Sequence, residues 1–97
     1  METDMSKKFE VTSNMLKRRT KFFKAIEKEL QRAYEKHGAH QWDRHQFYGI
    51  MLEEVDEAWS DIKSNAPQEQ LMAEVAQVAA MCFRYAETLD RYREPSE

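Results

Sequence analysis

The chain has 97 residues, of which 41% are hydrophobic and 34% charged, and it contains only two Gly and two Pro. A chain of this length forms a single domain, and folding removes only about 60 to 70% of its unfolded surface from water, so the core is thin. The scarcity of Gly and Pro excludes a sheet with many tight turns and favours a helical globular protein.

No segment of the sequence is typical of a membrane or export signal. The longest uncharged segment in the periodic part of the chain, residues 75–83, is far shorter than the roughly 20 apolar residues that cross a bilayer. No apolar run follows the lysines near the N-terminus, and the single Cys82 has no internal partner for a disulfide. We therefore expect a soluble, cytoplasmic protein without a membrane partner.

Charge is divided unevenly along the chain, whose net charge is -3. Residues 1–37 hold ten Lys and Arg against six Asp and Glu, whereas residues 38–97 hold five against twelve. Such an asymmetry is typical of a nucleic-acid-binding segment, but also of cations and anions arranged around a metal-phosphate ligand.

The first predicted elements are a loose arm and a helix. Residues 1–17 are polar and lack a sustained hydrophobic period, so we expect an N-terminal arm there. From Arg18 the apolar residues follow one face of an α-helix, which should end near Gly38, a residue suited to a helix C-terminus. That face consists of Phe22, Ile26, Leu30, Ala33 and Tyr34.

Two further helices follow. After a connection at residues 38–41, Asp43 is a candidate N-cap for the second helix. Residues 64–67 interrupt the periodicity, and Pro67 suits the start of a third helix that runs to about Tyr92. The apolar face of the second helix contains Phe47, Met51, Val55, Ala58 and Ile62, and that of the third contains Leu71, Val75, Val78, Cys82, Tyr85 and Leu89.

These elements predict an all-α fold, an antiparallel helical bundle over residues 18–93 with a tail at residues 94–97. The short connection makes the second and third helices an αα-hairpin, with the first helix packed across them. Trp59, Met72 and Phe83 lie off the main apolar faces, so their burial requires a short extra helix or another subunit. We therefore expect oligomerisation, as a homodimer or homotetramer, to complete the bundle.

Acidic residues gather on one flank of the second helix. At about 100° per residue, Glu54 lies roughly 60° from the centre of the apolar face, Glu57 roughly 120° and Glu53 roughly 160°. On the third helix, Glu74 lies only about 40° from the centre of the face expected to be buried. A carboxylate facing a core costs several kcal/mol unless it is paired or binds a cation. Arg84, ten residues further on, is too distant along the helix to pair with Glu74.

The spacing of these residues favours a shared metal ion. Glu54 and Glu57 are three residues apart, and Glu74 and Gln77 repeat that spacing on the antiparallel helix. A carboxylate pair alone is common on solvated helices, but the doubled pattern with one inward member indicates four converging oxygen ligands. An all-oxygen set suits Mg²⁺, with Mn²⁺ as the alternative, and not Zn²⁺.

At these positions the chain resembles the MazG-like, all-α nucleoside triphosphate pyrophosphohydrolase superfamily, in particular its small phage-type members. The sequence signature of that family is E-E-x-x-E on one helix and E-x-x-D on the next. Residues 53–57 read Glu-Glu-Val-Asp-Glu, and residues 74–77 read Glu-Val-Ala-Gln. Gln77 therefore stands where the family usually has Asp. The resemblance covers about residues 25–89.

The resemblance implies Mg²⁺-dependent hydrolysis of a (deoxy)nucleoside triphosphate to the monophosphate and pyrophosphate, a nucleotide clean-up activity. It implies that Glu54, Glu57 and Glu74 ligate the metal and that Gln77 takes the fourth place. Glu53 is then the catalytic carboxylate, which either supports the metal ligands or activates the water. The amide of Gln77 carries no charge, which weakens binding of a second ion. The chain is then a one-metal enzyme or an inactive relative.

Hydrolysis of a triphosphate also requires cations around the phosphates. Trp42 is a candidate for stacking on the base, although capping or core packing explains it too. His37, His40 and His45 match no zinc motif. The candidate phosphate contacts, each of which a surface charge would also explain, are Lys36, Arg44, Lys63 and Arg84.

Two other functions compete with the enzyme. The first is a degenerate relative that binds nucleotide or metal without turnover. The second is a nucleic-acid or protein interaction domain that uses the basic first segment, including Lys17, Arg18 and Arg19. Because these basic residues lie mostly on the polar side of the first helix, a solvated surface explains them, and nucleic acid is not the expected partner.

Overall fold

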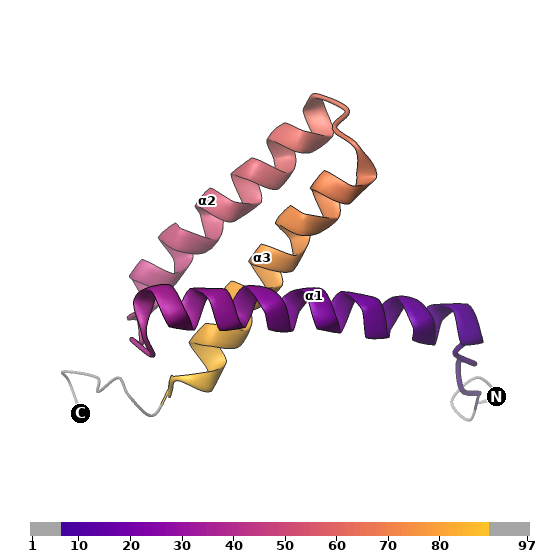
Figure 1. Cartoon of the computed structure of the whole chain (residues 1–97), viewed down its shortest axis with the longest axis horizontal. Helices are drawn as coiled ribbons and strands as arrows, with labels where there is room; N and C mark the ends of the chain where they lie inside the picture. Colours follow the sequence, from indigo (N-terminus) through magenta and orange to yellow (C-terminus); the bar gives the residue numbers. More distant parts are fainter. Residues whose placement is uncertain (1–6, 90–97) are drawn as a thin grey trace, which may run out of the picture.

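A computed structural model describes residues 7–89 of the chain, and over this range the fold is all-helical (Figure 1). It contains α1 (Ser13–His37), α2 (Arg44–Lys63) and α3 (Gln68–Glu87), with no strand among the described residues. The predicted all-α class and its three helices are confirmed. None of the helices in this range has both the length and the apolar character needed to cross a bilayer.

Helix α1 begins at Ser13, earlier than the predicted start at Arg18. The reason is a side-chain cap, because the Thr12 hydroxyl accepts a hydrogen bond from the Met15 amide at 3.1 Å. The arm is thus non-helical over residues 7–12, and its first six residues lie outside the described range. At the other end Gly38 has a φ of 72° and donates its amide to the Tyr34 carbonyl, which confirms the predicted C-terminal cap.

The predicted start of α2 is also confirmed. The Asp43 side chain accepts a hydrogen bond from the Gln46 amide at 2.8 Å, and the Gln46 side chain accepts one from the Asp43 amide at 3.0 Å. This reciprocal capping box fixes the first turn. Asn65, with a φ of 58°, turns the chain after α2, and Pro67 directly precedes α3.

Helix α3 ends at Glu87, before the predicted end near Tyr92. The next residue, Thr88, is buried, and its hydroxyl is hydrogen-bonded to the Gln41 side chain in the connection between α1 and α2. This tertiary contact fixes the end of α3. Residues 90–97, which include the predicted C-terminal tail, lie outside the described range.

Helix α3 is the centre of the molecule. Figure 1 shows α2 and α3 as an antiparallel hairpin, with α1 crossing α3 at a large angle. Within the described residues α3 packs against both other helices, whereas no Cα of α1 lies within 8 Å of a Cα of α2. The predicted hairpin is therefore confirmed, and α1 packs across α3 alone.

The core is as thin as the chain length predicts. Its buried apolar residues are Ile26 of α1 and Ala76 and Ala80 of α3. The two alanines allow the helices to approach closely, and the partly buried residues around them are Phe22, Ala25, Leu30 and Ala79. Helix α2 contributes no fully buried residue.

The face that α2 turns toward α3 differs from the predicted one. Phe47 stacks on Tyr85 with ring centroids 4.3 Å apart, and Met51 accepts a hydrogen bond from the Cys82 thiol. Val55 and Ile62, predicted on this face, are largely exposed. They belong instead to a row of residues on α2, each 40–59% exposed, that we call the α2 stripe: Tyr48, Leu52, Val55, Trp59 and Ile62. Met72 and Phe83 are exposed as well, as expected for apolar residues off the main faces.

Candidate metal centre and adjoining cavity

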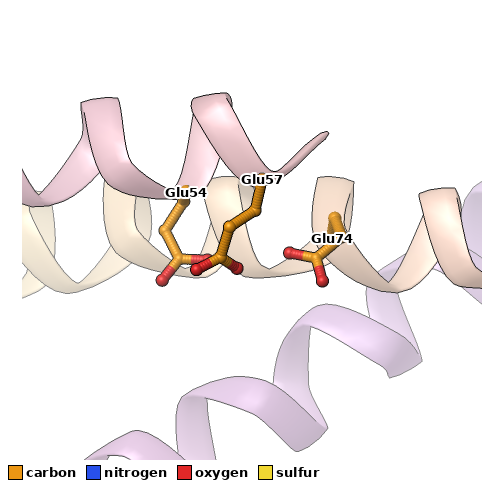
Figure 2. A group of neighbouring side chains, drawn as sticks. All are labelled: Glu54, Glu57 and Glu74. Carbon is orange, nitrogen blue, oxygen red and sulfur yellow. The ribbon is translucent and has the colours of Figure 1, made fainter. Parts of the chain in front are cut away.

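Three of the four predicted metal ligands converge between α2 and α3. Each of Glu54, Glu57 and Glu74 offers a carboxylate oxygen, and these oxygens all lie within 4.8 Å of one another. Figure 2 shows the three carboxylates turned into one space, two from α2 and one from α3. The i, i+3 spacing places the first two on one edge of α2, and the antiparallel hairpin brings Glu74 to meet them.

Several oxygens of this acidic cluster are buried without a hydrogen-bond partner. They are one oxygen each of Glu54, Asp61 and Glu74. The other oxygen of Asp61 accepts a hydrogen bond from the Gln70 amide at 2.9 Å. A buried polar atom without a partner costs about 1 to 3 kcal/mol, and more when it is charged. The cluster is therefore destabilising by itself and suited to a cation.

Burial and the charges of neighbouring carboxylates raise the pKa values of Glu74 and Glu54. Desolvation, a hydrogen bond with Glu57 and the charges of Glu57, Asp61 and Glu54 together raise the pKa of Glu74 to about 7. Desolvation, followed by the charges of Glu57, Glu53 and Glu29, raises the pKa of Glu54 above its usual range. At neutral pH Glu74 is thus partly protonated, and a divalent cation at the cluster would displace that proton.

Sequence reasoning missed Glu29 of α1 as a member of this environment. Glu29 is half-buried, forms an ion pair with Arg32 at 3.3 Å and contributes to the raised pKa of Glu54. The sequence feature that could have identified Glu29 is its position three residues after Ile26, which places a carboxylate within the apolar face of α1. This is the same kind of anomaly that singled out Glu74.

Gln77, the fourth predicted ligand, lies one turn after Glu74 on α3 and faces α1. It lines a small pocket of about 180 Å³ between the two helices. The predicted phosphate contact Lys36 lines this pocket too, together with Glu29 and Arg32.

A larger cavity of about 500 Å³ adjoins the acidic cluster and brings together several predicted residues. Glu53 and Glu54 of α2 line it together with Trp42 and Arg84. Arg44 and Lys63 line neither cavity, and the Lys63 ammonium lies over the Trp59 ring at 5.5 Å from its centroid. The residues lining the larger cavity are His37, His40, Trp42, Ile50, Glu53, Glu54, Met81 and Arg84.

The end of this cavity near Arg84 is held by buried polar contacts that sequence reasoning missed. Gln41 is buried, accepts the hydrogen bond from Thr88 and donates one to the Trp42 carbonyl at 2.8 Å. The connection between α1 and α2 is thereby tied to the end of α3. No periodic pattern marks Gln41, because a single polar residue in a short connection reads as solvent-exposed.

Comparison with protein-family models, curated proteins and solved structures finds no match to this chain. The resemblance to the MazG-like superfamily therefore rests on residues 53–57 and 74–77.

Proposed function

We propose that this protein is a Mg²⁺-dependent nucleoside triphosphate pyrophosphohydrolase that releases a (deoxy)nucleoside monophosphate and pyrophosphate in the cytoplasm. The observation that supports this function best is the convergence of Glu54, Glu57 and Glu74, with buried and unpartnered oxygens, beside a cavity of about 500 Å³. An all-oxygen set of this kind suits Mg²⁺, and Mn²⁺ satisfies the same chemistry.

In this proposal the three carboxylates hold the cation, and Gln77 offers a neutral oxygen one turn along α3. When bound, the cation neutralises phosphate charge and lowers the pKa of water. Glu53 is exposed and lines the cavity next to Glu54, which supports a role for its carboxylate in accepting a proton from the attacking water. Arg84 and Lys36 line the two cavities as positive charges for the phosphates.

The direct test is release of pyrophosphate from a panel of ribo- and deoxyribonucleoside triphosphates with Mg²⁺. We expect turnover by the natural chain and a loss of about 100-fold or more in Glu54→Gln, because a metal ligand contributes at least as much as the groups that orient it. Asp56→Asn is the matched control, since Asp56 is an exposed carboxylate of α2 outside the cluster. Equal activity of Glu54→Gln and Asp56→Asn would contradict the site.

A binding module without turnover is the second candidate, and Gln77 is the observation that favours it. Loss of one negative charge weakens the site for a second ion. Mg²⁺-dependent nucleotide binding by the natural chain, with no pyrophosphate release at micromolar enzyme, would establish the binding module in place of the enzyme.

We also propose that a second copy of the chain covers the α2 stripe. Its members alternate in steps of four and three, which is the spacing of a helix-pairing seam. The stripe lies about 120° to 180° around α2 from Glu54 and Glu57, so a copy seated on it leaves the acidic cluster open.

Sedimentation of the full chain tests this pairing. We expect the natural chain to be dimeric or larger at micromolar concentration and Trp59→Glu to be monomeric, because a charge at the centre of an apolar seam is costly to bury. Lys28→Glu is the control, with an exposed residue of α1 changed. A natural chain that sediments as a monomer would contradict the proposal.

A further inference from the structure

Arg84 is a buried cation with no acidic partner among residues 7–89. Its side chain is only 4% exposed, and its Nε has no hydrogen-bond partner. Among the described residues the single ion pair within 4 Å joins Arg32 and Glu29, so no carboxylate neutralises Arg84. Burying a charge without a counter-charge costs several kcal/mol.

The acidic residue best placed by helix spacing to pair with Arg84 is engaged elsewhere. Glu87 lies three residues after Arg84 on α3, but its carboxylate accepts a hydrogen bond from the Tyr34 hydroxyl at 2.7 Å. What lies against the guanidinium instead is aromatic, because its central carbon is 4.5 Å from the Trp42 ring centroid and 5.7 Å from that of Tyr34. Rings at these distances attract the positive charge, and the Nε–H group of the guanidinium stays without an acceptor.

The surroundings hold Arg84 in place. Trp42 is fixed through the hydrogen bond from Gln41 to its carbonyl, and Gln41 is in turn tied to Thr88, one turn after Arg84. A guanidinium held in this way presents its fork of donors with little further loss of side-chain entropy. The site is thus preorganised.

The cavity connects this cation with the acidic cluster. Arg84 lines it, and so does Glu54, a member of the cluster. Arg84 and Glu74 are ten residues apart on α3, so their backbones are about 15 Å apart along the helix. One cavity thus presents both a carboxylate of the cluster and the guanidinium of Arg84 to a ligand.

We propose that Arg84 binds the terminal phosphate of the ligand, so that the pyrophosphate part of a nucleoside triphosphate occupies the end of the cavity between Trp42 and Met81. The inference rests on the proposed function in its choice of substrate. A phosphate neutralises the buried charge and accepts two parallel hydrogen bonds from the guanidinium fork. A nucleobase edge offers acceptors but no charge, and would leave the burial of Arg84 uncompensated.

The test uses the two tryptophans of the chain as internal reporters. Trp42 lines the cavity, whereas Trp59 lies on the α2 stripe, and the sequence holds no other tryptophan. The ¹⁵N-labelled full chain is titrated with inorganic pyrophosphate in EDTA at low salt, with the indole signals assigned through Trp59→Phe. We expect the Trp42 signal to shift saturably while the Trp59 signal stays in place.

Two variants and one uncharged ligand make the test specific. We expect Arg84→Met to weaken pyrophosphate binding at least about tenfold, as for loss of a charge-assisted hydrogen bond. Arg84→Lys keeps the charge but lacks the guanidinium fork, so its pyrophosphate affinity should lie between those of the natural chain and Arg84→Met. An uncharged nucleoside should leave the Trp42 signal unmoved. Circular dichroism confirms that each variant is folded, and Arg84→Lys replaces Arg84→Met if the latter is not.

Three results would overturn the inference: no shift of the Trp42 signal with pyrophosphate, equal affinity in the folded variants, or a shift with the nucleoside alone. Because the titration contains no divalent ion, it is independent of turnover. Pyrophosphate binding without any triphosphate hydrolysis would reject the proposed function and keep the phosphate site. Triphosphate hydrolysis, together with a pyrophosphate affinity that does not depend on Arg84, would keep the proposed function and reject the phosphate site.

Discussion

Two regions of opposite charge border the larger cavity, which Glu54 and Arg84 both line. In the first, which we call the acidic end, Glu54, Glu57 and Glu74 place carboxylate oxygens within 4.8 Å of one another. In the second, which we call the basic end, Arg84 is buried against aromatic rings with no carboxylate partner among residues 7–89. Because the two charges are not paired with each other, the proposed function assigns a cation to the first region and a phosphate to the second.

The largest expected effect comes from removing charge at the acidic end. Glu74→Gln should lower metal-dependent pyrophosphate release about 100-fold or more, because it removes a proposed metal ligand. The same change should raise the melting temperature without divalent ions, since it relieves repulsion within the cluster. Glu69→Gln, at an exposed position in the first turn of α3, is the control. Unchanged pyrophosphate release in Glu74→Gln would contradict the proposed role of the acidic end in the same reaction as Arg84.

The pH dependence of the free energy of unfolding should also depend on the acidic end, through Glu74. The folded-state pKa of Glu74 is about 7, above its ordinary value of 4.5, so the folded chain binds more protons than the unfolded chain between these values. Without divalent ions the free energy of unfolding should therefore fall as the pH rises from about 4.5 through 7. Denaturant titrations at several pH values measure it. Glu74→Gln should flatten the profile, and an equally steep profile in that variant would assign the effect to other groups.

The smallest expected effect concerns the fixed position of Arg84. Thr88→Val keeps the shape of the side chain but removes the hydroxyl bonded to Gln41. We expect a loss of about 1 to 3 kcal/mol in the free energy of unfolding, because the Gln41 oxygen is left without this donor. Pyrophosphate affinity should fall by less than in Arg84→Met. Thr20→Val, at an exposed position of α1, is the matched control, and equal stability of both variants would count against the role of Thr88.

The acidic end could be predicted from the sequence, and the basic end could not. Glu54, Glu57 and Glu74 follow from local spacing together with one rule of topology, that a short connection makes neighbouring helices antiparallel. The caps at Gly38 and Asp43 are equally local, and both predictions are confirmed.

Arg84 was identified only as one of several candidate cations, because its burial depends on contacts between distant segments. It requires Trp42 and Tyr34 to meet the last turn of α3, and no single-helix pattern contains this information. The error on α2 has a similar origin. Its apolar residues cover more than one face, so periodicity alone could not decide whether Val55 and Ile62 face α3 or belong to the α2 stripe.

The central place of α3 has a consequence for opening of the fold. Because no Cα of α1 lies within 8 Å of a Cα of α2, undocking of α1 does not in itself separate the hairpin. Such an opening would remove Glu29, Lys36 and His37 from the cavity walls while Glu54, Glu57 and Glu74 stayed together on the hairpin. The charge of Glu29 acts on Glu54, so undocking of α1 would also ease the repulsion on that carboxylate.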